Sequence, residues 1–187
     1  STNIISEGEV LQLINCRDPA TTEERYMRVI HHKTAKMFES AAETGAVLGL
    51  GGGRPELREK LAAYGRHLGI AFQLVDDVLD YVGDAGELGK NVGDDLAEGK
   101  PTLPLIHAMR EGTPEQAAMI RNAILKGGLD HLDEILAVVR SSGGLDYTME
   151  QARKQTELAL AALVELPPSP YRETLEALAR EAVNRHF

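Results

Sequence analysis

The sequence predicts an all-α protein, a bundle of helices packed around one core. Apolar residues recur every three or four positions through most of the chain, and no stretch alternates apolar and polar residues as a strand does. Glycine or proline separates consecutive periodic segments. With 187 residues, 43% of them hydrophobic, the chain can bury one sizeable core, so we expect a single domain over residues 1–187.

Capping residues and glycines predict the helix boundaries in the first part of the chain. A capping box at residues 6–9 predicts a helix through Ile14, and a second box at residues 21–24 predicts a long helix to about Leu50. The glycines at 49 and 51–53 end that helix.

The third predicted helix runs from Pro55 to about Tyr81 and ends near Gly83. Its Gly65 and Gly69 lie four residues apart on one face, where they either let another helix pack closely or have no packing role. The segment that follows, residues 82–102, is glycine-rich and irregular. Such long loops in a compact domain are usually functional or disordered, and its place beside an acidic stretch favours a function.

The rest of the chain predicts five shorter helices. Thr113, Pro114 and Gln116 supply the cap, the first-turn proline and the N3 glutamine of one of them. The five are expected at residues 103–110, from 114 to about 126, over the apolar positions 132, 135, 136 and 139, over positions 149, 158, 162 and 163, and, after the prolines of 167–170, over positions 175, 178, 182 and 183.

The acidic stretch Asp76-Asp77-Val78-Leu79-Asp80 lies at the end of the third helix. Together with Gln73, its acids form one stripe of a helix that is otherwise apolar almost all round, which indicates burial. The helix dipole and mutual repulsion both disfavour anions there. A compensating cation is therefore expected, and clustered carboxylates suit Mg²⁺, which is commonly shared with a phosphate or diphosphate. The alternative is a solvated or salt-bridged helix end.

Composition excludes several classes of protein. A net charge of −9 argues against a nucleic-acid surface. Cys16 is the only cysteine, so an internal disulfide is impossible and a reducing compartment is expected. No apolar run approaches the roughly 18 residues of a membrane span, and residues 1–15 have no signal-peptide pattern. We expect a soluble cytoplasmic protein.

Four ordered stretches resemble one known family. Residues 72–80, Phe-Gln-Leu-Val-Asp-Asp-Val-Leu-Asp, resemble the second aspartate-rich motif of the trans-prenyltransferases, the all-α isoprenyl diphosphate synthases. Residues 8–13 resemble the helix that faces the first aspartate-rich motif, Lys33-Thr34 the pair that meets the allylic diphosphate, and residues 89–104 the loop after the second motif. The similarity spans the whole chain and is greatest to the bacterial octaprenyl diphosphate synthases, whose products become quinone side chains.

The resemblance implies a reaction and a metal site. In the family an allylic diphosphate ionises, the double bond of isopentenyl diphosphate attacks the cation, and a proton is lost. Asp76, Asp77 and Asp80 would bind Mg²⁺ that bridges to the diphosphate, and Lys33, Asp76 and Asp77 would be the catalytic residues. Metal and lysines would stabilise the charge that develops on the leaving group.

The resemblance also implies substrate contacts. Lys33, Lys90 and Lys100 would neutralise the diphosphate, while Thr34 and Gln73 would supply hydrogen bonds. Gln12 would face the first metal cluster. Purely structural readings remain open for each of these residues, since Lys33 could be a solvated helix lysine and Gln12 a surface amide.

The sequence departs from the family pattern in one respect. The first aspartate-rich motif and the basic region for isopentenyl diphosphate have no counterpart in residues 1–187. We therefore expect the C-terminal, incomplete part of an isoprenoid-synthase bundle, with little synthase activity by itself. Exposed apolar surface is expected, and with it association with the missing N-terminal half or, as is common in the family, a homodimer. Product length is not readable, because in the family it depends on residues before the first motif.

Two other functions remain open. The chain could be a non-catalytic helical subunit of a heteromeric prenyl synthase, and the sequence preceding Ser1 would distinguish this from the enzyme. A terpene-cyclase-like enzyme is less consistent with the sequence, since its second metal motif usually mixes Asn, Ser or Thr with acids.

Overall fold

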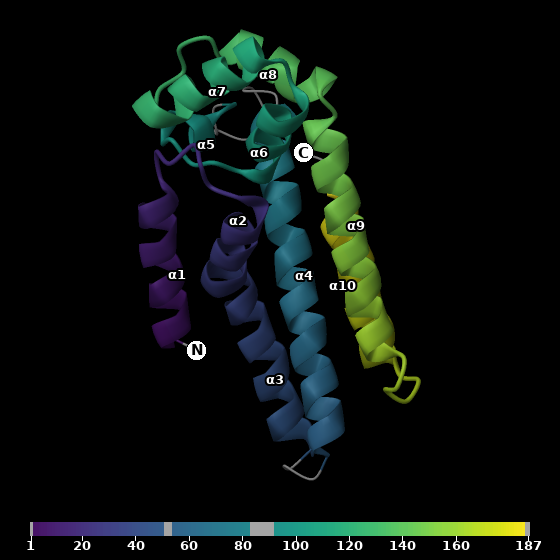
Figure 1. Cartoon of the computed structure of the whole chain (residues 1–187). Coiled ribbons are helices and arrows are strands. Elements are labelled where there is room, and N and C mark those ends of the chain that lie inside the picture. The colour runs from purple at the N-terminus through teal and green to yellow at the C-terminus, as the bar shows by residue number, and fades with distance from the viewer. Residues whose placement is uncertain (1, 51–53, 83–91, 186–187) are drawn as a thin grey trace. The chain divides into compact units, whose positions relative to one another are not determined.

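The computed structural model describes residues 2–50, 54–82 and 92–185. Within these ranges the chain is helical and contains no strand, which confirms the all-α prediction (Figure 1). The elements, in chain order, are α1 Thr2–Asn15, α2 Glu23–Ile30, the π-helix η1 His31–Ala35, α3 Lys36–Leu50, α4 Pro55–Val82, α5 Asp94–Ala97, α6 Leu103–Glu111, α7 Pro114–Lys126, α8 Leu132–Ser141, α9 Gly144–Leu163 and α10 Pro170–Asn184.

The chain divides into two compact units. The first comprises the described residues of 2–8, 30–75 and 151–185, and the second those of 9–29 and 76–150. Helices α1, α2, α4 and α9 contribute residues to both units, α2 only through Ile30. The prediction of a single domain stays a prediction.

In the first unit, α4 packs against α3 and η1 through glycines. A Cβ atom at Gly65 would lie 2.4 Å from the Phe38 carbonyl oxygen, and one at Gly69 would lie 2.6 Å from the Ala35 Cα. Only glycine permits such an approach, so the close-packing interpretation of this pair is confirmed. A second set of contacts joins α4 to α9 and α10 around the buried residues Tyr64, Ala159, Ala162, Leu163 and Ala179.

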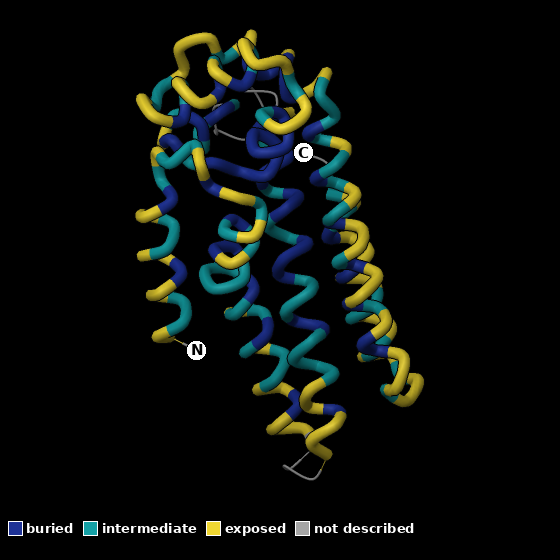
Figure 2. The backbone as a smooth tube through the Cα atoms, viewed as in Figure 1, coloured by how far each residue is buried: buried dark blue, intermediate teal, exposed yellow. Residues whose placement is uncertain are grey.

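In the second unit, short helices enclose another apolar core. The end of α4 contributes Tyr81, α5 contributes Leu96, and α6, α7 and α8 supply the remaining buried residues. The burial pattern in Figure 2 follows these helices, whose buried residues are drawn dark blue. Gly93 precedes α5 with a φ of 85°, a left-handed conformation that glycine adopts without strain.

Several predicted boundaries are confirmed and three are wrong. Helices α4, α6 and α7 begin where predicted, and the Thr113–Gln116 capping box makes both of its hydrogen bonds. The predicted start of a helix at residue 6 is wrong, because α1 already includes Thr2. The cap of α2 is Thr22 and not Thr21, since the Thr22 hydroxyl accepts from the Arg25 amide at 3.2 Å.

The third error concerns the loop at residues 82–102. Its residues 92–102 contain the one-turn helix α5, whereas residues 83–91 lie outside the described ranges. The long helix predicted to end near Leu50 does end there, but η1 interrupts it at His31–Ala35.

Apolar side chains are exposed on both units, as expected. In the second unit Val10, Leu13 and Ile14 project from one face of α1 and are 54%, 73% and 61% exposed. In the first unit Met37 and Leu48 of α3 are exposed to a similar degree. None of the described helices combines the length and apolarity that crossing a membrane requires.

Candidate active site

The three aspartates of the acidic stretch lie on the last two turns of α4 and differ in burial. Asp77 is only 3% exposed, whereas Asp76 and Asp80 are half-buried. Their neighbours Val75, Val78 and Tyr81 belong to the core. The stretch is therefore partly buried, as its apolar surroundings indicated.

Asp77 is bound by a residue of α2. The Tyr26 hydroxyl donates to the Asp77 Oδ2 atom at 2.6 Å, and both side chains are buried. A hydrogen bond to an ionised acceptor is stronger than one between neutral groups, and inside a protein it is needed to offset desolvation. For one of the three aspartates, the protein itself therefore supplies a hydrogen-bond donor.

Asp80 lies beside the start of α5 and close to further acids. Its Oδ2 atom accepts from the Asp95 backbone N–H at 3.3 Å. Burial, followed by the charges of Asp95 and Asp94, raises the pKa of Asp80 from 3.8 to about 7. The backbone amides oppose this change but do not cancel it, so the second unit holds an acidic cluster whose negative charge is only partly compensated.

Lys100 is a cation that contacts an acid of that cluster. Its ammonium group contacts the carboxylates of Asp95 and Glu98, each at 2.9 Å. Desolvation lowers the pKa of Lys100, but the two carboxylates outweigh it and raise the pKa above its usual value. Lys100 thus stays charged and neutralises protein acids, a role that the sequence analysis did not assign to it.

Asp76 is the aspartate of the stretch for which residues 2–50, 54–82 and 92–185 supply no partner. Its side chain makes no hydrogen bond or ion pair with any residue in the described ranges. A half-buried carboxylate at a helix C-terminus is unfavourable without a counter-charge. Asp76 is therefore the acid best suited to bind a group from outside the chain.

In the first unit, Thr34 and Gln73 lie together. The Thr34 hydroxyl donates to the Gln73 Oε1 atom at 3.0 Å. Lys33 and Thr34 both belong to the π-helix η1, and π-turns inside α-helices occur frequently at functional sites. A Cβ atom on Gly8 would lie 2.5 Å from the Lys33 backbone nitrogen, so α1 also packs closely against this turn.

The other predicted site residues have no defined role in the structure. Gln12 is half-buried on α1 in the second unit, and Lys90 lies outside the described residues. The structure thus brings together Thr34 with Gln73 in one unit, and Asp80 with Lys100 through Asp95 in the other.

Comparison with known proteins identifies the family. Polyprenyl synthetases match residues 1–139, about three quarters of the chain by residue count (139 of 187). The chain belongs to the polyprenyl synthetase family. The resemblance inferred from the sequence motifs is thereby confirmed.

Two curated members of the polyprenyl synthetase family illustrate the similarity. Octaprenyl diphosphate synthase of Escherichia coli (strain K12) is 55% identical over 186 residues, which are 99% of this chain and 57% of that protein. All-trans-nonaprenyl-diphosphate synthase (geranyl-diphosphate specific) of Rhodobacter capsulatus is 51% identical over 181 residues, 97% of this chain and 55% of that protein. The chain thus spans little more than half the length of these relatives.

Solved polyprenyl synthases have the same fold. A polyprenyl synthase from Caulobacter crescentus CB15, in complex with calcium and isoprenyl diphosphate, matches with a TM-score of 0.91 at 41% identity. The match covers 99% of this chain and 56% of that one. A decaprenyl diphosphate synthase from Rhodobacter capsulatus matches with a TM-score of 0.89 at 42% identity over 98% and 56% of the two chains.

The acidic side chains at the end of α4 suit a hard cation, although they do not form a closed set of ligands. In the described ranges no three acidic, histidine or cysteine side chains converge closely enough to hold a metal ion. Asp77 is bound by Tyr26 and Asp80 accepts from an amide of α5, which accounts for this. Mg²⁺ does not need three converging protein ligands, because it keeps several waters and binds substrate phosphates through one or two carboxylates. Asp76, which has no partner in the part of the chain that the structure describes, and the only partly compensated charge around Asp80 fit such a cation.

Sequence reasoning missed two residues of this candidate site. The sequence patterns give no role to Tyr26 of the second predicted helix or to Asp95 of the loop motif at residues 89–104. A buried tyrosine usually finds a hydrogen-bond partner, which was a signal that Tyr26 needs an acceptor. No local pattern indicates that its acceptor is Asp77, 51 residues away.

Proposed function

We propose that this chain is the C-terminal, catalytic portion of a trans-prenyltransferase that extends an allylic diphosphate with isopentenyl diphosphate units. Family membership supports this proposal, as do identities of 55% and 51% with an octaprenyl and a nonaprenyl diphosphate synthase. Both relatives make long products, so we propose a long-chain product, octaprenyl diphosphate, which would serve as a quinone side chain.

The main structural support for the proposal is the environment of Asp76. It is the acid of the stretch that has no partner in the described ranges, and it lies where the helix dipole disfavours an anion. We assign Asp76, with Asp77 and Asp80, as the ligands of Mg²⁺. When bound, the cation supplies positive charge to the diphosphate oxygens. Calcium in the Caulobacter relative supports a divalent ion.

Residues of the first unit would bind the substrate. Lys33 would contribute an ammonium group to the diphosphate of the allylic substrate. Thr34 would supply its hydroxyl, whose orientation is set by the bond to Gln73. Fixed positive charge and fixed donors aid catalysis because they stabilise the charge on the departing diphosphate more than that of the bound substrate.

We assign two roles to Lys100, one toward the acids of the protein and one toward the diphosphate. Its contacts with Asp95 and Glu98 reduce the repulsion around Asp80, and the same ammonium group would be available to a diphosphate through its third donor. Lys90, from the same loop motif, stays a proposed diphosphate ligand by resemblance alone, and Gln12 a proposed neighbour of the first metal cluster.

The remaining parts of the proposal concern the whole enzyme. Residues 1–187 hold one of the two aspartate-rich motifs of the family, so this chain alone is expected to be inactive. The exposed apolar faces of α1 and α3 would be covered by the N-terminal part of the synthase or by a second copy in a homodimer. A cytoplasmic location stays a prediction.

Replacing Asp76 in the complete synthase tests this proposal. Asp76→Ala is expected to lower kcat by two orders of magnitude or more, since electrostatic groups of this kind contribute about 10²-fold to 10³-fold. Asp130→Ala is the matched control, because Asp130 is an exposed acid of the same unit. Incorporation of radiolabelled isopentenyl diphosphate measures both. An unchanged rate and an unchanged Mg²⁺ dependence of Asp76→Ala would refute the metal assignment.

A further inference from the structure

The hydrogen bond between Tyr26 and Asp77 is unusual in its degree of burial. Tyr26 is 5% exposed and Asp77 3%, and the distance of 2.6 Å is that of a strong O–H···O bond to an ionised acceptor. The two residues lie on different helices, α2 and α4, and both belong to the second unit. A fold that buries a carboxylate this fully must supply a donor for it, and Tyr26 is one.

The direction of this bond is fixed. An ionised carboxylate oxygen can only accept a hydrogen bond, so the Tyr26 hydroxyl is the donor to the Asp77 Oδ2 atom. A phenol has a single proton to donate, and the Asp77 oxygen receives it. The Asp77 carboxylate is therefore held in one orientation at the Oδ2 atom.

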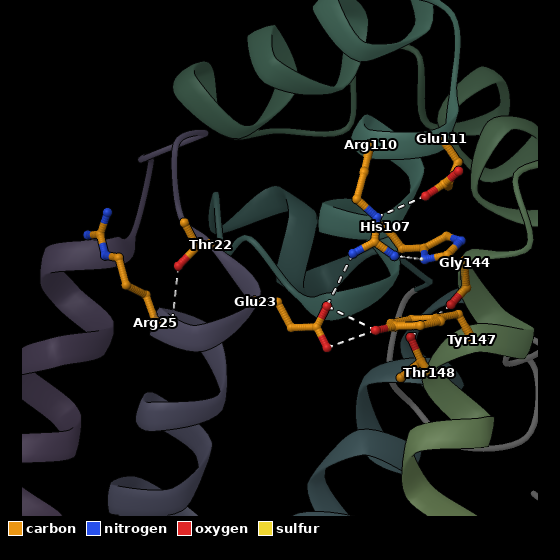
Figure 3. Close-up of polar contacts among 9 residues, drawn as sticks. All are labelled: Thr22, Glu23, Arg25, His107, Arg110, Glu111, Gly144, Tyr147 and Thr148. Atoms are coloured by element: carbon orange, nitrogen blue, oxygen red, sulfur yellow. Dashed lines mark hydrogen bonds and ion pairs between the residues drawn. The ribbon is translucent and has the colours of Figure 1, made fainter.

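A polar cluster at the start of α2 holds that helix in place. Tyr147 of α9 donates to both carboxylate oxygens of Glu23, at 2.9 and 3.0 Å, and Arg110 of α6 approaches the same carboxylate at 3.4 Å (Figure 3). His107 stacks on the Tyr147 ring with centroids 4.4 Å apart. All four side chains belong to the second unit.

This cluster controls the position of Tyr26. Glu23 and Tyr26 are three residues apart on α2 and therefore lie on neighbouring positions of one helix face. Anchoring Glu23 to α6 and α9 limits sliding or rotation of α2 against the end of α4. The phenol then meets Asp77 without further rearrangement.

We propose that Tyr26 is a positioning residue for the aspartate stretch: its hydroxyl fixes the buried Asp77 carboxylate, and the Glu23 cluster fixes Tyr26. This inference rests on the proposed function, because it gives the stretch a cation and a diphosphate to bind. Tyr26 acts through Asp77 and touches neither substrate nor metal. Tyr26 would raise the affinity of the stretch for a cation. Without this hydrogen bond, the Asp77 carboxylate would lose conformational freedom on binding the cation, and that loss would weaken binding.

The test compares two tyrosine-to-phenylalanine variants in the complete synthase. Tyr26→Phe removes the bond to Asp77. Tyr64→Phe is the matched control, because Tyr64 is 2% exposed and its hydroxyl donates to the Leu175 carbonyl at 2.8 Å in the first unit. The first readout is the Mg²⁺ concentration for half-maximal activity at saturating substrates. The second, which needs no turnover, is the rise in Tm that Mg²⁺ with inorganic pyrophosphate produces.

Tyr26→Phe is expected to raise the half-activating Mg²⁺ concentration about tenfold, the lower end for loss of a hydrogen bond to a charged group, and to remove most of the Tm rise. Tyr64→Phe is expected to lower the Tm without ligand while leaving both readouts at wild-type values. Tyr147→Phe, which loosens α2 without touching Asp77, is expected to raise the half-activating concentration about twofold to threefold, as loss of one partly exposed hydrogen bond does.

The outcomes separate this inference from the proposed function. If Tyr26→Phe matches the wild type in both readouts while the wild type responds to Mg²⁺ and pyrophosphate, Tyr26 has no positioning role and the proposed function stands. If the wild type itself neither elongates prenyl chains nor gains stability with Mg²⁺ and pyrophosphate, the proposed function fails and this inference with it.

Discussion

The charge of Asp80 predicts a stability that depends on pH in a definite direction. Burial and the neighbouring carboxylates raise the pKa of Asp80 to about 7 in the folded chain, whereas 3.8 is its ordinary value and applies to the unfolded chain. The folded state therefore binds this proton more tightly than the unfolded state. The stabilisation it provides is complete below pH 3.8 and is lost as the pH rises through 7.

The perturbation is Asp80→Asn, which removes the charge and keeps an oxygen that accepts from the Asp95 amide. The interval from 3.8 to about 7 corresponds to about 4 kcal/mol at 1.36 kcal/mol per pKa unit. Screening by solvent around a half-buried carboxylate reduces this to about 1 to 2 kcal/mol. Without metal, the variant should therefore exceed the wild type in stability by about 1 to 2 kcal/mol at pH 8 and by nothing near pH 3.5.

Thermal unfolding with EDTA present, followed by circular dichroism between pH 3.5 and 8, measures this difference. For a chain of this size about 1 kcal/mol moves the Tm by roughly 2 to 4 °C, so the advantage at pH 8 should be several degrees. Asp130→Asn, at an exposed acid, is the control and should leave the Tm nearly unchanged at pH 8. A Tm difference for Asp80→Asn that is the same at all pH values would show that Asp80 does not titrate in this interval.

Three further outcomes are expected. Gly65→Ala places a Cβ 2.4 Å from the Phe38 carbonyl and should lower the unfolding free energy by about 1 to 3 kcal/mol in a urea titration; Gly45→Ala, which meets nothing within 4 Å, should not lower it. Lys33→Met in the complete synthase should raise the KM for the allylic diphosphate about tenfold or more, as loss of a charged contact does, whereas the same change at the exposed Lys126 should not. The purified 187-residue chain should form no polyprenyl product from labelled isopentenyl diphosphate and Mg²⁺; robust elongation by it would contradict our assignment of half an active site.

Much of the fold was predictable because its signals are local. Proline, glycine and capping residues set the boundaries of α4, α6, α7 and α10, and these signals act within one turn of the helix. The capping box of α7 needs only residues three positions apart, and both of its bonds are present. The errors at α1 and α2 are of one or a few residues, where neighbouring serines and threonines compete as caps.

The π-helix η1 was not predictable from the same signals. It lies where two glycines on other helices meet its backbone: Gly8 approaches Lys33, and Gly69 approaches Ala35. Helix periodicity in the sequence does not report such contacts, because they depend on segments more than 20 residues away. The two residues with proposed roles in this turn, Lys33 and Thr34, were recognisable only by resemblance.

The three aspartates share one expected role as metal ligands, and the structure gives each of them different surroundings. Asp77 takes a hydroxyl from Tyr26, Asp80 takes an amide from the start of α5, and Asp76 has no partner in the described ranges. Spacing along α4 places all three at the helix end but says nothing of these partners. These differences arise from tertiary contacts, so the spacing predicts where the aspartates lie but not which groups contact them.

These differences bear on why the stretch needs a cation. At the end of α4 the helix dipole opposes every one of the three charges. Among the described residues, the groups that offset this cost include the Tyr26 phenol, backbone amides at the start of α5 and a lysine that is shared between two other acids. The pKa of Asp80, raised to about 7 by burial and the neighbouring carboxylates, indicates that these groups do not fully offset the cost of its charge. A fold selected for stability alone would replace one of the acids, since an amide at position 80 keeps the hydrogen bond without the repulsion. Retaining all three is consistent with a divalent ion that is bound during function and supplies the missing positive charge.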